Sequence, residues 1–315
     1  MPNSEIHIIL NPASGAGKAR SKFSSILGEF HRLFGHSYSV HITRWPLDAT
    51  QATSEAVRNG SRFVVAIGGD GTIQEIVNGM FANGHLINPD CALGIVNCGT
   101  GHGFAQSLGL PHSIEKQIEL LRNGDCRPID LGRVTFRDNQ GETRYRYFVN
   151  ECQLGIGASV VKRVQRQHKK LGGTLAFGLG VLEAVFEHEN QCIRMTFDQK
   201  ETITQNVTGI VVANGAYTGG GMNLAPTARL DDGRLNVLVM HDLSIWQRLR
   251  SFPRIYTGTH LSMSLFSYHE TKTLAVESGE AVRVEADGEL LGETPCFVET
   301  IPSVLKVQSI SKNGE

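Results

Sequence analysis

The chain has 315 residues, which corresponds to roughly two domains at about 150 residues per domain. Hydrophobic residues make up 40% of the sequence and charged residues 19%, a composition typical of folded globular proteins and unlike that of disordered or collagen-like chains. Because 30 Lys and Arg oppose 31 Asp and Glu, the formal net charge is only -1, and we expect no nucleic-acid partner.

Cysteine usage and hydropathy predict where the protein works. None of the six cysteines forms a C-x-x-C pair, which favours free thiols in a reducing, cytoplasmic compartment. The first residues lack the pattern of a signal peptide. The longest strongly apolar run, residues 171–182, is too short to span a bilayer, so we expect any membrane contact to be peripheral, at the inner face of the membrane.

Residues 1–128 alternate between strand and helix patterns. Short apolar or alternating runs predict strands at 6–10, 39–43, 63–67 and 92–96. Apolar residues at helical spacing predict amphipathic helices after Gly17, around Ile73–Met80 and after a capping Ser113. Strands separated by crossover helices predict a mostly parallel sheet that is covered on both faces.

The pattern changes to short strands and turns after about residue 128. Strands are predicted at 145–150, 193–197, 209–213, 234–240, 273–276 and 282–286. At most two helices are expected here: one within 162–186, and one over 244–256 that Pro253 interrupts. The second part of the chain is therefore predicted to be a mainly antiparallel β domain.

The strongest local motif is the segment Gly68-Gly69-Asp70-Gly71-Thr72, which follows a predicted buried strand and opens a helix. In such a turn, backbone N–H groups and the positive end of the helix converge on an anion. Glycines allow the phosphate to approach because they carry no Cβ. The sequence therefore predicts a phosphate site here, whereas a plain strand-to-helix turn is the structural alternative.

Two other glycine-rich segments do not fit better-known nucleotide loops. The segment Ser14–Lys18 lacks two residues of the P-loop pattern, because Pro12 and Ala19 stand where a glycine and a hydroxyl are needed. The segment Gly99–Gly103 does not have the spacing of a dinucleotide-binding loop. Neither binding mode is expected.

Eight ordered motifs together resemble one family. They are Asn11-Pro-x-Ser-Gly15; Gly68–Thr72 with Glu75 and Asn78-Gly79; Gly99-Thr100 with Phe104-Ala105 and Leu108–Pro111; Asp130-Leu-Gly132; Asn150 with Gly155-Ile-Gly157; Gly219–Met222 with Ala225-Pro226; Asp232-Gly233; and Asp287-Gly-Glu289. In this order they resemble the diacylglycerol kinase catalytic-domain family of lipid kinases, which includes sphingosine and ceramide kinases and soluble bacterial homologues.

The resemblance implies a fold with two domains and a site in the cleft between them. It implies an ATP-binding α/β domain over residues 1–128, to which residues 301–315 return, and an antiparallel β-sandwich over residues 129–300 that binds the lipid acceptor. It also implies ATP contacts for a set of loop residues, with Glu75 supporting the loop: Asn11, Thr43, Gly68, Gly69, Asp70, Gly71, Thr72 and Thr100. Asp70 and Asp130 would organise the phosphates and Mg²⁺.

The Asp287-Gly288-Glu289 segment has a rationale of its own. Val282, Val284 and Ala286 alternate with polar residues, so an extended continuation would place Asp287 and Glu289 on one side. Phosphoryl transfer uses a carboxylate to accept the hydroxyl proton. The resemblance favours Glu289 as that base, with Asp287 assisting; the alternative is a hairpin turn with two exposed acids.

The segment Asp231-Asp232-Gly233 is ambiguous, because Asp-Gly is also a favoured hairpin turn. The resemblance implies a structural Mg²⁺ site that involves Asp232 with Arg229 and Arg234, built from an Asp side chain and backbone carbonyls. Oxygen ligands suit this hard cation.

One position departs from the family, and one surface suggests a partner. Where the family commonly has Asn-Asp, this chain has His102-Gly103, so a carboxylate expected near the nucleotide is missing. The stretch Lys162–Lys170 is basic with interspersed valines, a pattern that either rests on anionic lipid headgroups or forms a solvated helix face.

The sequence therefore predicts an ATP- and Mg²⁺-dependent kinase that phosphorylates a hydroxyl of a lipid such as diacylglycerol or a sphingoid base. Two alternatives stay open: a kinase for a soluble acceptor, as in NAD kinases, which share a GGDG loop, and a catalytically weakened nucleotide- or lipid-binding regulator. The acceptor lipid and the oligomeric state are open at this point.

Overall fold

The protein consists of two compact units, Met1–Ile129 with Ser303–Glu315 and Asp130–Pro302. The computed structural model describes residues 5–15, 17–99, 101–123, 125–164 and 173–310. Two strands carry the chain between the units: β7 (Cys126–Arg137) and the 20-residue β16 (Glu289–Gln308).

The first unit is built on a parallel sheet. Its order is β2-β1-β3-β6, formed by β2 (Tyr38–Ile42), β1 (Ile6–Leu10), β3 (Phe63–Gly68) and β6 (Ala92–Asn97). Lys306 and Val307 at the end of β16 add a further parallel pairing to β6. The predicted parallel sheet is confirmed, because β3 and β6 are buried almost throughout and need cover on both faces.

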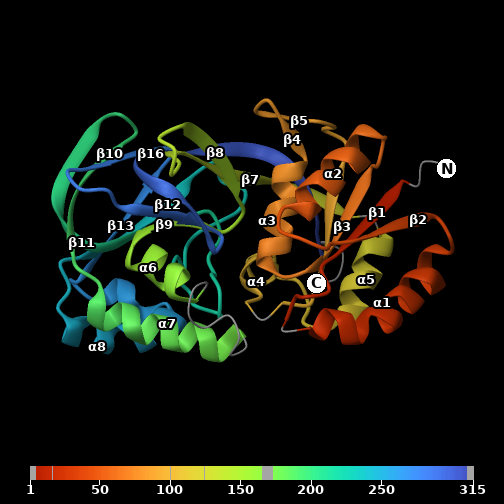
Figure 1. Ribbon diagram of the computed structural model, residues 1–315, viewed down its shortest axis with the longest axis horizontal. Coiled ribbons are helices and arrows are strands. Elements are labelled where there is room, and N and C mark those ends of the chain that lie inside the picture. Colours follow the sequence, from red (N-terminus) through yellow and green to blue (C-terminus); the bar gives the residue numbers. More distant parts are fainter. Residues whose placement is uncertain (1–4, 16, 100, 124, 165–172, 311–315) are drawn as a thin grey trace. The chain divides into compact units, whose positions relative to one another are not determined.

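Helices cover both faces of this sheet. α1 (Lys18–Phe34) and α5 (Ile114–Asn123) pack on one face around Ile8, Phe30 and Ile118. α2 (Asp48–Arg58) packs against α3 (Asp70–Gly79), and Figure 1 shows α2 on the other side of the strands from α1 and α5. Ser113 caps α5 as predicted, since its hydroxyl accepts the N–H of Lys116 at 3.3 Å. The unit also contains the short α4 (Gly103–Ser107) and a hairpin of β4 (Phe81–Ala82) and β5 (His85–Leu86).

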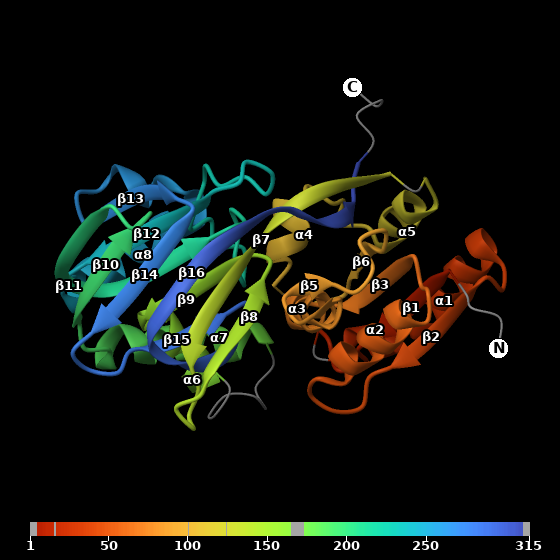
Figure 2. The same ribbon diagram turned by 90° about the horizontal axis from the view of Figure 1, so that it is seen from above.

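The second unit is mainly antiparallel β structure. Its other strands are β8 (Thr143–Phe148), β9 (Glu151–Gly155), β10 (Gln191–Phe197), β11 (Glu201–Ala213), β12 (Leu235–His241), β13 (Phe266–Thr271), β14 (Thr273–Ser278) and β15 (Arg283–Ala286). β11 pairs with β10 along its first half and with β9 along its second, while β16 pairs with β14 and β15. Figure 2 shows β8 beside β7, with which it forms a hairpin.

Because β9 also pairs with β15, the strands β11, β10, β14, β16, β15 and β9 close on themselves. Side chains from all of these strands fill one apolar core, which includes Leu154, Met195, Ile210, Val284 and Val298. Closing the strands around a core leaves fewer unpaired strand edges.

The helices of the second unit correct two predictions. Three α-helices are described where at most two were expected: α6 (Ile156–Arg163), α7 (Gly173–Glu187) and α8 (Ile245–Thr257), which Figure 1 shows together below the strands of this unit. The helix predicted within 162–186 corresponds to α7, and α6, which begins directly after Gly155, is the additional helix. Pro253 does not interrupt α8; its ring is exposed, and the helix continues so that Ile255 packs into the core beneath.

Candidate active site

In the first unit, four loops meet at one edge of the parallel sheet. Asn11 follows β1, Thr43 follows β2, the Gly68–Thr72 loop follows β3, and the segment from Asn97 follows β6. These four strands are parallel neighbours, so their carboxyl ends lie at the same edge. In open α/β sheets this edge is where ligands bind.

Hydrogen bonds fix the first of these loops to the third. The side-chain amide of Asn11 donates to Thr72 Oγ1 at 3.0 Å, and the backbone N–H of Asn11 donates to the carbonyl of Ile67 at 2.9 Å. Thr43 is joined to the same sheet edge by its N–H, which donates to the carbonyl of Leu10 at 2.9 Å. Two predicted nucleotide contacts, Asn11 and Thr43, therefore lie at adjoining strand ends, and a third, Thr72 in the first turn of α3, is bonded to Asn11.

The glycines of these loops are required by close approach. A Cβ on Gly99 would lie 2.6 Å from the Cα of Gly69, and a Cβ on Gly68 would lie 2.5 Å from Thr72 Oγ1. Gly71 is different: it is exposed at the start of α3, and a Cβ there would meet no protein atom within 4 Å. The glycine loop therefore leaves backbone open at the positive end of α3, where a phosphate fits. Thr100, also predicted to contact ATP, lies outside the described residues.

Asp70 starts α3 and links the two glycine loops. Its carboxylate accepts the N–H of Gly103 at 3.3 Å and the N–H of Phe104 at 3.2 Å, both in the first turn of α4. Burial raises the pKa of Asp70, and the two N–H donors oppose that rise. His102, with φ of 53°, precedes α4, so the backbone N–H groups of Gly103 and Phe104 point to Asp70 where the family commonly has a second carboxylate.

Glu75 reaches a neighbouring helix. Its carboxylate accepts the N–H of Ala49 in the first turn of α2 at 3.2 Å, and its carbonyl accepts the Thr50 hydroxyl at 2.9 Å. A carboxylate near the N-terminus of a helix is favourable because of the helix dipole. Glu75 thus ties α3 to α2, the helix that follows the loop of Thr43.

In the second unit, motifs far apart in the sequence join one buried network. The Asn214 amide donates to the carbonyls of Asp130 at 3.0 Å and Val149 at 2.9 Å, and the Asn214 N–H donates to the carbonyl of Asn150 at 2.7 Å. The carboxylate of Asp130, fully buried, accepts the N–H of Gly233 at 2.6 Å. Asp130, Asn150 and Asp232-Gly233 are therefore parts of one arrangement, and Asn214 is a member that the sequence motifs did not include.

Asp287 is the anchor of this network. Its carboxylate accepts three backbone N–H groups, from Val149 at 2.7 Å, Asn150 at 2.9 Å and Glu151 at 3.1 Å. Its own N–H donates to the carbonyl of Glu151 at 3.0 Å. A carboxylate held by this many donors is fixed in place, and the position of the following residues is fixed with it.

The geometry expected for Asp287 and Glu289 is wrong. Asp287 has φ of 47° and Gly288 φ of 84°, and Ala286 pairs with Glu289, so Asp287-Gly288 is a two-residue hairpin turn rather than a continued strand. The two carboxylates have different partners: Asp287 binds backbone, whereas Glu289 Oε1 accepts a hydrogen bond from Arg146 at 3.2 Å. Glu289 remains partly exposed, as a base for an incoming substrate must be.

A third acid, Glu285, is buried next to this turn, which the sequence did not predict. Glu285 was predicted on the polar face of its strand, yet it is fully buried, because the pairing of β15 with β16 shifts between Val284 and Glu285. One carboxylate oxygen accepts the N–H of Gly288 at 2.9 Å, while the other has no hydrogen-bond partner among the described residues. Burial raises the pKa of Glu285 to about 8; the Gly288 N–H opposes this rise and the charge of Asp287 adds to it.

The residues expected at a structural Mg²⁺ site bind one another or a neighbouring acid. Asp232 accepts the N–H of Arg234 at 3.0 Å, whereas the Arg229 guanidinium pairs with Asp231 at 3.3 Å. Burial and the nearby Asp130 raise the pKa of Asp232, and the Arg234 N–H opposes this. Over the described part of the chain, no three His, Cys, Asp or Glu side chains gather as a ready-made metal cluster.

Only part of the basic stretch Lys162–Lys170 can be placed. Arg163 on α6 is paired with Glu187 at 2.7 Å and lies 3.9 Å from Glu183, both on α7. From residue 165 onward the stretch lies outside the described residues. None of the described helices has both the length and the apolar character that crossing a membrane demands.

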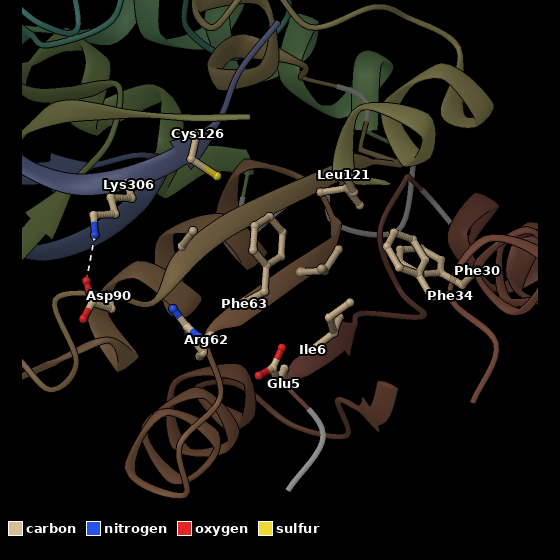
Figure 3. A pocket seen from close by; sticks show the side chains of 12 residues that line it. Glu5, Ile6, Phe30, Phe34, Arg62, Phe63, Asp90, Leu121, Cys126 and Lys306 are labelled. Carbon is tan, nitrogen blue, oxygen red and sulfur yellow. Dashed lines mark hydrogen bonds and ion pairs between the residues drawn. The ribbon is translucent and has the colours of Figure 1, made fainter. Parts of the chain in front are cut away.

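A separate hollow of about 330 Å³ lies at the opposite edge of the first unit's sheet (Figure 3). Ile6, Phe63 and Ala92, at the amino-terminal ends of three strands, line it, and an ion pair of 2.9 Å joins Asp90 to Lys306 at its side. Since ligands of such sheets bind at the carboxyl ends, this hollow is not the nucleotide site.

Comparison with known proteins defines the class of fold first. A solved structure of a diacylglycerol kinase from Bacillus anthracis str. Sterne matches with a TM-score of 0.70 and 19% identity, over 98% of this chain and 97% of that one. An NAD kinase from Archaeoglobus fulgidus in complex with ATP matches with a TM-score of 0.53 and 12% identity, over 98% and 94%. These likenesses show that the chain shares the fold of these two structures.

The sequence comparisons then give the family. The Diacylglycerol kinase catalytic domain matches residues 5–134, and the YegS C-terminal NAD kinase beta sandwich-like domain matches residues 150–309. A Probable lipid kinase YegS-like from Chromohalobacter salexigens is 30% identical over 86% of this chain and 82% of its own length. A Diacylglycerol kinase from Bacillus subtilis is 28% identical over 91% and 90%. The chain belongs to the family of YegS-like lipid kinases and bacterial diacylglycerol kinases.

Proposed function

We propose that this protein transfers the γ-phosphate of ATP to the free hydroxyl of diacylglycerol or of a lipid with a similar headgroup. The observation that carries the proposal is the pair of glycine loops that touch backbone to backbone at Gly69 and Gly99. Their contact leaves the start of α3 open for a phosphate chain. The family supports a lipid acceptor, because relatives named as lipid kinases match along nearly the whole chain.

In the first unit, the chain's own groups would bind the nucleotide. Asn11 and Thr72, already joined by a hydrogen bond, would line the phosphates together with the N–H groups of Gly69–Gly71. Asp70 is held by α4 at a single N–H on each oxygen, so lone pairs remain on both oxygens for further ligands. These fixed donors would favour the charge distribution of the transferring phosphoryl group.

Magnesium fits this donor set. Mg²⁺ in kinase sites is bound by one or two carboxylates, substrate phosphates and water, so it does not need a cluster of three protein ligands. Asp70 would hold Mg²⁺ beside the phosphates. Asp130, which belongs to the second unit, would help to organise the phosphates and the ion. Bound there, Mg²⁺ would neutralise phosphate charge. Whether Asp232 and the neighbouring backbone hold a second, structural ion stays a proposal.

In the second unit, Glu289 would accept the proton of the lipid hydroxyl. It is partly exposed, and Arg146 holds one of its oxygens. Asp287 would act as a positioning residue, because its three backbone hydrogen bonds fix the turn from which Glu289 extends. The proposal requires that a hydroxyl held by the second unit reach the γ-phosphate held by the first. We further propose that the enzyme works in the cytoplasm, which the free thiols of its six cysteines support.

The test is a transfer assay with radiolabelled ATP, Mg²⁺ and a panel of acceptors: diacylglycerol and a sphingoid base in mixed micelles, and NAD in solution. The wild-type chain is expected to label diacylglycerol. Glu289→Gln should lower turnover roughly 100-fold or more while ATP affinity is unchanged. Glu277→Gln is the matched control, since this exposed acid on β14 pairs only with Arg194 among the described residues.

Two outcomes would overturn the proposal. Labelling of NAD but of no lipid would assign a soluble acceptor. ATP binding by a folded wild-type chain with no labelled acceptor in the panel would assign a regulator. Asp70→Asn checks the nucleotide side: it should remain folded and lose turnover, and full activity in this variant would contradict the role given to Asp70.

A further inference from the structure

The outer face of α7 and α8 exposes large apolar side chains. Trp246 on α8 is 81% exposed, and Phe186 and Leu182 on α7 are 53% and 49% exposed. Phe186 and Leu182 are four residues apart and thus lie on the same side of their helix. The two helices pack against each other through Val181 and Val185 on α7 and Leu249 and Phe252 on α8, and Figure 1 shows them side by side.

The fold does not need these side chains for its own core. The inner side of α8 is occupied by Arg248, Ser251 and Ile255, all buried. Arg248 locks α8 to the end of α7, because its guanidinium donates to the carbonyls of Val185 at 2.9 Å and His188 at 2.8 Å. Trp246 stands on the opposite side of α8 from these residues. An exposed apolar group of this size on a rigid pair of helices indicates an interaction site.

Positive charge accompanies the tryptophan. Arg250 and Arg254 follow Trp246 at four and eight residues, so all three lie along one side of α8, and both arginines are exposed. No acid pairs with either arginine among the described residues. The acids of α7 have another partner: Glu183 and Glu187 face Arg163 of α6.

We propose that the outer face of α7 and α8, formed by Leu182, Phe186, Trp246, Arg250 and Arg254, docks the protein on an anionic lipid bilayer. An indole ring is favourable at the membrane–water interface, and guanidinium groups beside it are attracted to anionic headgroups. Two apolar side chains on α7 would add buried area. This inference rests on the proposed function, because a kinase that acts on a lipid within a bilayer must reach that bilayer.

Trp246 itself reports on docking. The sequence has two tryptophans, so Trp45→Phe in the full-length chain leaves Trp246 as the sole indole. Without ATP, vesicles of phosphatidylglycerol should shift the Trp246 emission to the blue, and brominated acyl chains should quench it. Vesicles of phosphatidylcholine should give a much smaller response, and high salt should reverse the response. The proposal is overturned if both lipids give the same response or if neither does.

Variants separate docking from folding. Trp246→Ser and the double change Arg250→Glu with Arg254→Glu should each reduce the fraction bound to phosphatidylglycerol vesicles, measured by co-sedimentation, roughly tenfold. Tyr145→Ser is the matched control, because Tyr145 is a 47% exposed aromatic residue on β8, away from this face. Circular dichroism and thermal unfolding should match the wild type for all three, since the side chains are exposed. Reduced vesicle binding in Tyr145→Ser alone would contradict the assignment.

Turnover measured on two different acceptor lipids tests the docking surface separately from the proposed function. Trp246→Ser should keep wild-type turnover on monomeric, short-chain diacylglycerol and lose roughly tenfold on long-chain diacylglycerol in phosphatidylglycerol vesicles. If the wild type binds vesicles and phosphorylates neither lipid, the proposed function fails and the docking surface stands. If Trp246→Ser matches the wild type on both lipids and in binding, the docking surface fails alone. A dimer in sedimentation without vesicles that Trp246→Ser dissociates would identify a second copy as the occupant and overturn the proposal.

Discussion

The two units hold their predicted site residues in different ways. In the first unit, short loops at neighbouring strand ends supply backbone N–H groups, and glycines allow two of these loops to touch at Gly69 and Gly99. In the second unit, buried polar side chains hold distant segments together, with Asp287 binding three N–H groups and Asp130 binding the N–H of Gly233. The residues proposed to bind the nucleotide thus depend on missing side chains, and those proposed to serve the acceptor depend on buried side chains.

This difference has an energetic consequence. Glycines allow the two loops to approach each other, and an added Cβ on Gly99 would press against the backbone of Gly69. A buried carboxylate is stable only while its donors remain, and removing it leaves those donors without partners. Substitutions in the second unit should therefore affect stability most, and substitutions in the glycine loops should affect nucleotide binding most.

The largest effect is expected for Asp287→Ala. The change leaves the N–H groups of Val149, Asn150 and Glu151 without their carboxylate, which should lower the free energy of unfolding by about 3 kcal/mol. Urea denaturation followed by circular dichroism measures the loss. Asp231→Ala, an exposed acid, should change the free energy by less than about 1 kcal/mol. Equal losses of unfolding free energy in both variants would show that Asp287 does not anchor this network.

Glu285→Gln should change the pH dependence of stability. The folded-state pKa of Glu285 is raised from 4.5 to about 8, so between these values the folded state retains a proton that the unfolded state releases. Stability contributed by this group is therefore present at low pH and declines as pH rises, by at most about 1.4 kcal/mol per pH unit. Glu285→Gln, which cannot ionise, should flatten this decline. Urea midpoints at pH 5, 6.5 and 8 test it, and parallel curves for the two proteins would contradict the prediction.

Gly99→Ala should weaken nucleotide binding. Its Cβ would lie 2.6 Å from the Cα of Gly69, so the two glycine loops must move apart. We expect about a tenfold loss of ATP affinity, or roughly 1.4 kcal/mol, by isothermal titration calorimetry. Gly28→Ala on α1 is the control, because a Cβ there meets nothing within 4 Å, and it should leave ATP affinity unchanged. Unchanged affinity in Gly99→Ala would show that the loop contact is not needed for binding.

The smallest effect is expected for Arg229→Ala. This side chain is 69% exposed and pairs with Asp231 on the surface, an interaction that contributes less than about 1 kcal/mol. Since a guanidinium cannot coordinate a cation, the Mg²⁺ concentration for half-maximal activity should also stay unchanged. A clear shift in that concentration would favour a structural metal site in this loop.

Local patterns predicted much of the first unit. The strands β1, β3 and β6 and the helices α1 and α5 follow from apolar spacing and from the cap at Ser113. α2 was missed, because most of its buried positions are alanines and a threonine, which give no stripe of large apolar residues. Small residues suit this helix, since it packs so close to α3 that a Cβ on Gly79 would meet the Thr50 carbonyl at 2.4 Å.

By itself, the sequence determined the family, the alternation of strand and helix, and the glycine loops, because each of these is written in neighbouring residues or in the order of short motifs. Tertiary structure alone decided how Asp287 and Glu289 are used. A two-residue turn and a shifted strand pairing buried Asp287 and Glu285 and left Glu289 partly exposed. The turn itself is a local feature, but β15 also pairs with β9, and Asp287 binds the N–H groups of Val149, Asn150 and Glu151. These contacts join residues more than a hundred positions apart, and no local pattern specifies them.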